Sequence, residues 1–179
     1  DNYYKQAPWR GTWDLDGGTL MNQCIHNIDL MQWMIGSEVE RVYAECDTYR
    51  NNIEGEDFGA ILVRFKNGAI GIIEGSAVVY PKNLEETLSI FGTQGTVVIG
   101  GLAVNELKTW RFEGEDEDAV KAGLQVEIDS VYGEGHTPLI RDVIYAINED
   151  RKPYVSGEDA IVPLSIILAA YKSRKTGMP

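Results

Sequence analysis

Three polar side chains between residues 17 and 36 have the types and the spacing of an acid–base site. Asn22, His26 and Asp29 follow one another at intervals of four and three residues. A helix turns by about 100° per residue, so these intervals place an amide, an imidazole and a carboxylate on one side. Trp33 extends the same line. An imidazole beside a carboxylate has its tautomer and basicity set, as a general base requires.

The same spacing also fits an ordinary hydrated helix face, on which Asp29 and His26 form only a local side-chain pair. Two features favour a site. Asn22 is a weak helix former in an early turn, and the line carries none of the Lys and Glu residues that usually cover an exposed helix.

The other side of this predicted helix, residues 18–35, is apolar. Seven residues form it: Leu20, Met21, Cys24, Ile25, Ile28, Met31 and Ile35. Such a helix buries one side and keeps the polar line outside the core. Gly36 is suited to end the helix. Gly17 and Gly18 suit a strained start, or the close approach of a ligand or another backbone.

The rest of the chain predicts an antiparallel sheet. Alternating or apolar runs predict strands at residues 39–49, 57–65, 69–79, 84–91, 96–99, 106–112 and 125–131. The turn Asn67-Gly68 and the turn at residues 92–95 each predict a hairpin. Strands 57–65 and 69–79 are apolar on both faces. One face can pack on helices, and the other must bury against something else.

Helices are predicted at residues 137–148 and 160–171, and the acidic run at 113–118 is predicted to be a solvated loop. The order of elements and the short connections predict an α+β fold. We expect a large, mainly antiparallel open β-sheet with helices packed on one face, in a single domain of residues 1–179.

The composition argues against several classes of partner. The formal net charge of −12 disfavours nucleic acids and anionic membranes as partners. No apolar run approaches the ~20 residues that span a bilayer. No Cys/His cluster has the spacing of metal ligands, so no metal is expected. Cys24 and Cys46 are interpreted as buried thiols, which fits a reducing cytoplasm.

The chain starts without Met in sequence that is already patterned, so we expect a piece of a longer protein. It has neither a Gly-x-Gly-x-x-Gly turn nor the βαβ alternation of a dinucleotide-binding domain. The lead-in, residues 1–16, is predicted to be a loop that Trp9 and Trp13 anchor. Arg10 lies between them and is suited to meet a carboxylate or a phosphate.

The run GGTLMNQCIHNIDLMQW resembles the signature Gly-Gly-x-Leu-x-(Asp/Asn)-x-x-x-His-x-x-Asp of the Gfo/Idh/MocA oxidoreductases. These are NAD(P)-dependent sugar and cyclitol dehydrogenases and related enzymes. The runs YYKQAPWRGTW at residues 3–13 and YGEGH at 132–136 resemble one branch, which oxidises UDP-N-acetylglucosaminuronate at C3 of the sugar.

The resemblance implies roles for four residues, and residue chemistry more than the motif suggests one for Arg10. His26 would be the base, or would orient the reacting hydroxyl, and Asn22 would hydrogen-bond the sugar or the cofactor amide. Asp29 would support His26 or bind sugar hydroxyls. Arg10 would bind the uronate carboxylate, and His136 would contact the sugar weakly. Many relatives carry Asp at the position of Asn22, and the Asn of this chain would shift more of the proton transfer to His26 and to the absent Lys.

The resemblance also implies which part of an enzyme this is. It would be the C-terminal substrate-binding and oligomerisation domain, inactive alone, forming a dimer or tetramer through the open sheet face. NAD or NADP would be bound mainly by an N-terminal Rossmann domain, which this chain lacks together with its Glu-Lys-Pro motif. The alternatives are a binding domain without redox activity and a purely structural assembly domain.

Overall fold

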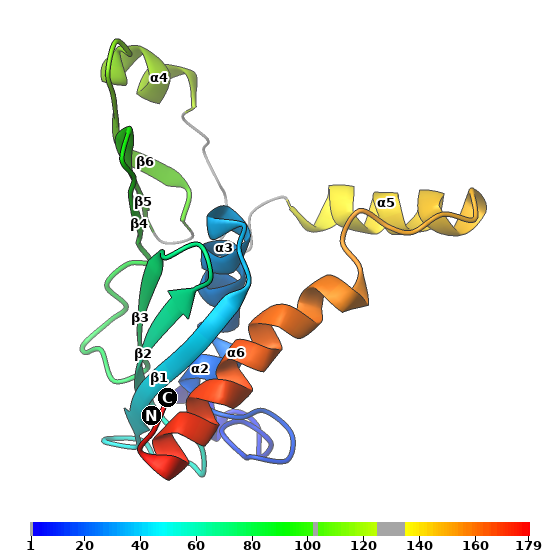
Figure 1. The fold of residues 1–179 in the computed structure, drawn as a ribbon. Coiled ribbons are helices and arrows are strands. Elements are labelled where there is room, and N and C mark those ends of the chain that lie inside the picture. The colour runs from blue at the N-terminus through cyan, green and yellow to red at the C-terminus, as the bar shows by residue number, and fades with distance from the viewer. Residues whose placement is uncertain (1, 102–103, 125–134) are drawn as a thin grey trace. The chain divides into compact units, whose positions relative to one another are not determined.

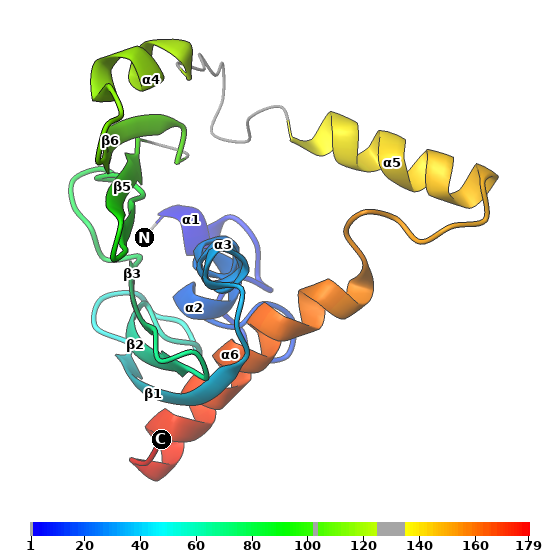
Figure 2. The ribbon, with the colours of Figure 1, turned by 45° about the horizontal axis from the view of Figure 1, so that its top comes forward.

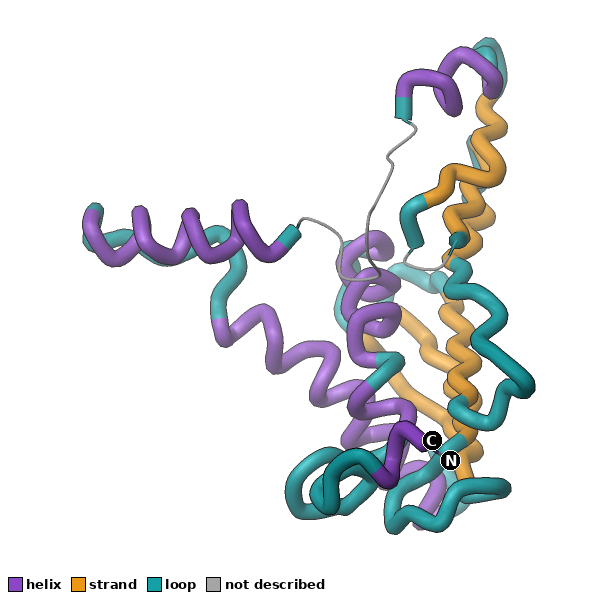
Figure 3. Tube along the Cα trace, turned by 180° about the vertical axis from the view of Figure 1, so that it is seen from behind, coloured by secondary structure: helices purple, strands orange, loops and turns teal. Residues whose placement is uncertain are grey.

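The computed structural model describes residues 2–101, 104–124 and 135–179. They form two compact units: Asp1–Tyr80 with Gly157–Pro179, and Pro81–Ser156. The single domain of residues 1–179 stays a prediction. The α+β class with antiparallel strands is confirmed, and the strands are shared between two three-stranded sheets (Figure 3).

The sheet of the first unit contains β1 (Val39–Asp47), β2 (Phe58–Phe65) and β3 (Ile70–Ser76), in the order β1-β2-β3. Both pairs of strands are antiparallel. The predicted hairpin at Asn67-Gly68 is confirmed: Gly68 has φ +92°, and its amide donates to the carbonyl of Phe65. The alternation of β1 is also confirmed, because Val42 and Ala44 are buried and their neighbours are exposed.

The helices of the first unit are α1 (Asn2–Lys5), α2 (Thr19–Asn22), α3 (Ile25–Ile35) and α6 (Gly157–Thr176). Figures 1 and 2 show α2, α3 and α6 on one face of the β1–β3 sheet. The core lies between them, and its largest fully buried apolar side chains are Phe65, Leu20, Ile28, Ile61, Ile167 and Val63. The apolar side predicted for residues 18–35 therefore faces this core.

The prediction of one continuous helix over residues 18–35 is wrong, because the helix breaks between α2 and α3. The amide of Cys24 donates to the carbonyl of Thr19, five residues back, at 2.9 Å. A hydrogen bond that spans five residues, and not four, widens the turn and interrupts the regular pattern of α-helical hydrogen bonds. Gly36, in the left-handed conformation at φ +61°, ends α3 as predicted.

The second unit contains β4 (Leu88–Phe91), β5 (Gly95–Gly100) and β6 (Glu106–Phe112), in an antiparallel sheet of that order. The hairpin at residues 92–95 is confirmed. Two helices, α4 (Glu117–Gly123) and α5 (His136–Asn148), belong to the same unit.

The prediction of a loop over residues 113–118 is partly wrong, because α4 begins at Glu117. Asp116 accepts hydrogen bonds from the amides of Asp118 and Ala119, so it caps the start of α4. The strand predicted at 125–131 lies outside the described residues. Within the described ranges, no helix combines the length and the apolar character needed to cross a membrane.

Candidate functional site

The Gly17-Gly18 turn brings the start of the helix pair against the loop before β2. The amide of Thr19 donates to the carbonyl of Glu56 at 2.8 Å, and the amide of Leu20 donates to Glu56 Oε1 at 2.7 Å. Gly17 has φ +79°, and a Cβ at Gly18 would lie 2.1 Å from Glu56 Oε2. At Gly18 the expected close approach is therefore to Glu56, which caps α2 from across the fold, whereas a Cβ at Gly17 would meet Met21.

Glu56 is only 3% exposed, and sequence analysis did not single it out. The hydroxyl of Tyr171 in α6 donates to Glu56 Oε1 at 3.1 Å. Burial raises the pKa of Glu56 against the opposing effect of these hydrogen bonds. Burial and the nearby Glu56 carboxylate raise the pKa of Tyr171. No pattern in the sequence marks a lone Glu before a strand as a cap for a distant helix.

Asp57, the next residue, is fully buried, and its pKa is shifted in the opposite direction to that of Glu56. Burial acts to raise the pKa of this carboxyl, but donors outweigh it and the net pKa is lowered. The backbone amides of Asn51, Tyr49 and Arg50 all donate to it, at 2.7 to 2.9 Å. Asp57 therefore holds the turn that leads to Glu56.

The predicted polar line lies outside the core. Asn22 is half-buried, and His26 and Asp29 are exposed. Asp29 Oδ1 accepts a hydrogen bond from Gln32 Nε2 at 3.1 Å, and no hydrogen bond or ion pair among the described residues joins Asp29 to His26. The imidazole is therefore accessible to a ligand, and Asp29 does not orient it in this structure.

Asn22 contacts the lead-in through both ends of its amide. Its Nδ2 donates to Asp16 Oδ1, and the hydroxyl of Tyr3 donates to Asn22 Oδ1 at 3.4 Å. The other carboxylate oxygen, Asp16 Oδ2, accepts from the amide of Gly11 at 2.6 Å. The lead-in is thereby held against the polar line of the helix pair.

Arg10 lies in the same network, one side chain away from Asn22. Its Nη1 donates to the carbonyl of Tyr3 at 2.9 Å and to Gln6 Oε1 at 2.7 Å. Its guanidinium lies 4.1 Å from the centre of the Tyr3 ring and 5.4 Å from that of Trp9. Nη2 makes no hydrogen bond within the described residues, so this nitrogen is available to an anionic ligand.

His136 is the exposed first residue of α5 in the second unit. The other predicted site residues lie in the first unit. The structure therefore brings Arg10 and Asn22 together, with His26 on the following helix, and leaves the role of His136 a prediction.

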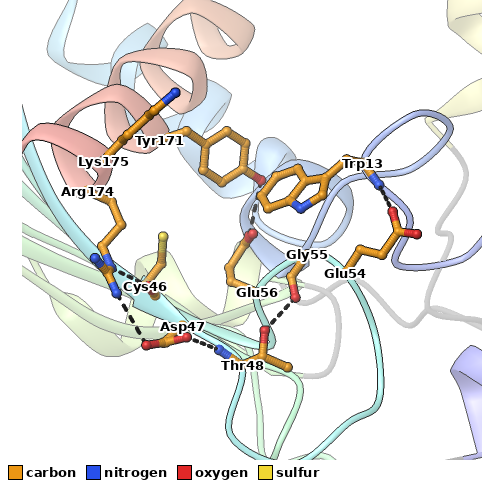
Figure 4. A pocket seen from close by; sticks show the side chains of 10 residues that line it. All are labelled: Trp13, Cys46, Asp47, Thr48, Glu54, Gly55, Glu56, Tyr171, Arg174 and Lys175. Carbon is orange, nitrogen blue, oxygen red and sulfur yellow. Dashed lines mark hydrogen bonds and ion pairs between the residues drawn. The ribbon is translucent and has the colours of Figure 1, made fainter.

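Residues of the first unit, Glu56 among them, line a pocket of about 360 Å³, and Figure 4 shows these side chains. Trp13 packs edge-on against Tyr171, with ring centres 5.1 Å apart, and anchors the lead-in there as predicted. Cys24 is buried, but Cys46 is only half-buried and lines this pocket. Burial, followed by the charge of Glu56, raises the pKa of the Cys46 thiol to about 11. A thiol with so high a pKa is a poor nucleophile.

A family model described as the GFO/IDH/MocA C-terminal domain matches residues 1–98. The WlbA dehydrogenase from Bordetella pertussis, solved in complex with NADH and UDP-GlcNAcA, is 39% identical with a TM-score of 0.89. The match covers 99% of this chain and 51% of that chain. The WlbA dehydrogenase from Chromobacterium violaceum, in complex with the same two molecules, is 37% identical over 99% of this chain and 49% of its own, with a TM-score of 0.86.

A curated relative, myo-inositol 2-dehydrogenase from Thermotoga maritima, is 26% identical over 164 residues. These residues make up 89% of this chain and 47% of that protein. The chain thus spans about half the length of the curated relatives it matches.

Proposed function

This chain belongs to the GFO/IDH/MocA family as a C-terminal domain, and from that premise we propose that it is the substrate-binding half of an NAD(H)-dependent sugar dehydrogenase. We propose a UDP-N-acetyl-hexosaminuronate as the substrate, oxidised at C3. The likeness to the two WlbA dehydrogenases, and the ligands with which they were solved, support this choice.

The observation that carries the proposal is the accessible polar line beside Arg10. Oxidation of a secondary alcohol removes a hydride from carbon and a proton from the hydroxyl. His26, exposed on α3, takes this proton as a general base. Asn22 hydrogen-bonds the ligand, and the free Nη2 of Arg10 meets the uronate carboxylate. Asp29 binds sugar hydroxyls, because its contact in the structure is to Gln32 and not to His26.

Of a nicotinamide cofactor, the described residues are suited to contact the nicotinamide ring with its carboxamide, and not the phosphates. An amide at Asn22 and an imidazole at His26 suit a neutral carboxamide and a reacting hydroxyl. The sequence has no glycine-rich phosphate turn, so the phosphates must be held by another part of the complete enzyme. When bound, the nicotinamide supplies the chemistry of hydride acceptance.

The test is His26→Ala in the complete enzyme, with Gln23→Ala as a control on an exposed residue of the same segment. We expect His26→Ala to lower kcat by about 10²-fold or more with UDP-GlcNAcA and NAD, and Gln23→Ala to have little effect. Near-normal turnover of His26→Ala would refute the role of His26 as the base. Wild-type enzyme that binds UDP-GlcNAcA without oxidising it would instead indicate a binding domain without redox activity.

We also propose that the chain forms a homo-oligomer through the open face of the β1–β3 sheet. Tyr43, Leu62 and Ile72 are directly paired across the three strands and are 37%, 47% and 77% exposed. Another copy of the chain would bury this exposed apolar row in an interface.

A further inference from the structure

The side-chain amide of Asn22 faces a carboxylate, and this contact determines which way the amide is turned. A carboxylate only accepts hydrogen bonds, so the group that meets Asp16 Oδ1 must be the NH2 of Asn22. The opposite orientation would place two acceptors in contact. The carbonyl oxygen of Asn22 is therefore turned away from Asp16.

Asp16 is itself held on its other side. Its second oxygen accepts from the amide of Gly11 at 2.6 Å, so both carboxylate oxygens are engaged. The oxygen of Asn22 accepts only a long hydrogen bond, 3.4 Å, from the hydroxyl of Tyr3. An amide oxygen has two lone pairs, so Asn22 Oδ1 retains acceptor capacity.

We infer that Asp16 is a positioning residue that holds one N–H of Asn22 and so orients Asn22 to offer its carbonyl oxygen to the ligand. This inference rests on the proposed function. The group that Asn22 recognises is then a donor, either a sugar hydroxyl or the NH2 of the cofactor carboxamide. An Asn oriented in this way offers the same acceptor as an Asp, but without a second charge beside Asp16.

The first experiment measures the unfolding midpoint of this chain between pH 4 and pH 8. The variants are Asn22→Asp, the transposed pair Asp16→Asn/Asn22→Asp, and Gln23→Glu as the control that adds a carboxylate one residue away. Asn22→Asp brings two carboxylates together, which raises the pKa of one of them. The hydroxyl of Tyr3 also lies in this contact, and Tyr4, whose pKa is raised by burial, lies near Asp16.

We expect Asn22→Asp to have a lower unfolding midpoint than the wild type at pH 8. This difference should shrink as the pH falls toward 4. The transposed pair should match the wild type across the range, because an amide again meets a carboxylate, and Gln23→Glu should show no such pH dependence. An Asn22→Asp midpoint equal to the wild type at every pH, or a transposed pair no better than Asn22→Asp, would overturn the orientation.

The second experiment uses the complete enzyme with UDP-GlcNAcA and NAD. We expect Asn22→Asp to lower kcat at pH 8 by about tenfold or more, and the transposed pair to recover most of it, because Asp at position 22 still offers an acceptor. A transposed pair that is stable but inactive would show that the ligand uses the NH2 of Asn22, and would overturn the inference. Wild-type enzyme without turnover would refute the proposed function and the ligand contact derived from it, while the first experiment still decides the orientation.

Discussion

At the scale of single residues, a buried carboxylate determines where the helix pair begins. Glu56 accepts the Thr19 amide through its carbonyl, and the Leu20 amide and the Tyr171 hydroxyl through its side chain. The helix it caps is only four residues long, and Gly18 provides no side-chain cap. Since isolated short helices are unstable, this cap is what keeps α2, and with it Asn22, in place.

Because the pKa of Glu56 is raised in the folded chain, its stabilising contribution is fully present below the ordinary glutamate pKa, near 4.5, and is lost as the pH rises through the folded value. We therefore expect the free energy of unfolding of the wild type to fall, relative to Glu56→Gln, as the pH rises from about 4 to neutrality. Denaturant titrations of both proteins at several pH values measure this difference.

Asp57→Asn is the matched control, because the pKa of Asp57 is lowered on folding. Its carboxylate stabilises the fold above the ordinary aspartate pKa, and this stabilisation is lost as the pH falls through the folded value. The two variants should therefore diverge from the wild type in opposite pH directions. A Glu56→Gln curve that runs parallel to the wild type would contradict a raised pKa for Glu56.

At the scale of elements, the helices pack closely on the sheet because β2 and β3 carry glycines on their buried face. A Cβ at Gly71 would lie 2.3 Å from Met31 Sδ, and a Cβ at Gly75 would lie 2.1 Å from Cys24 Sγ. Met31 can move the end of its flexible side chain, but the Cys24 sulfur lies one bond from its Cβ. The fit is therefore least adaptable at Gly75.

We expect Gly75→Ala to destabilise the fold by about 1–3 kcal/mol through overpacking against Cys24. For a domain of this size, each kcal/mol lowers Tm by roughly 2–4 °C. Gly157→Ala is the control in the same unit, because a Cβ at Gly157, the first residue of α6, meets nothing within 4 Å. Thermal unfolding of both variants compares them, and equal Tm values would show that the contact at Gly75 relaxes without cost.

At the scale of the whole molecule, the open face of the β1–β3 sheet is suited to pair with itself. The strand register places Arg41 and Arg64 side by side on one flank of the apolar row. Glu45 and Glu74 lie on the other flank, each paired with Ala60 of β2. A two-fold axis that runs along the apolar row, across the strands, would place the basic flank of one copy on the acidic flank of the other.

We expect this chain to sediment as a dimer or larger oligomer at micromolar concentration, and Ile72→Glu to raise the dissociation constant by about tenfold or more. Leu15→Glu is the control, because Leu15 is 72% exposed and lies outside the sheet. Arg64→Glu should weaken association, and adding Glu74→Arg should restore it across the two-fold axis. A wild-type chain that sediments as a monomer would refute the proposed interface.

The sequence by itself determined the faces of the elements and the turns between neighbours. The burial of Leu20 and Ile28, the alternation in β1 and the hairpin at Asn67-Gly68 were all predicted correctly. These features depend on residues close together in the chain, because side-chain periodicity and turn chemistry are local. The family signature in residues 17–33 was recognised for the same reason.

Only the tertiary structure decided the partners of the polar side chains. Glu56 meets Leu20 across 36 residues and Tyr171 across 115, and no local pattern encodes either contact. Asp29 is near His26 in sequence, yet it bonds Gln32, because a side chain selects among all the partners that the folded chain brings within reach. The amide of Asn22 likewise faces Asp16 only because the lead-in folds back on the helix pair. The sequence predicted that this polar line lies outside the core, and only the folded chain decided which atoms its side chains present.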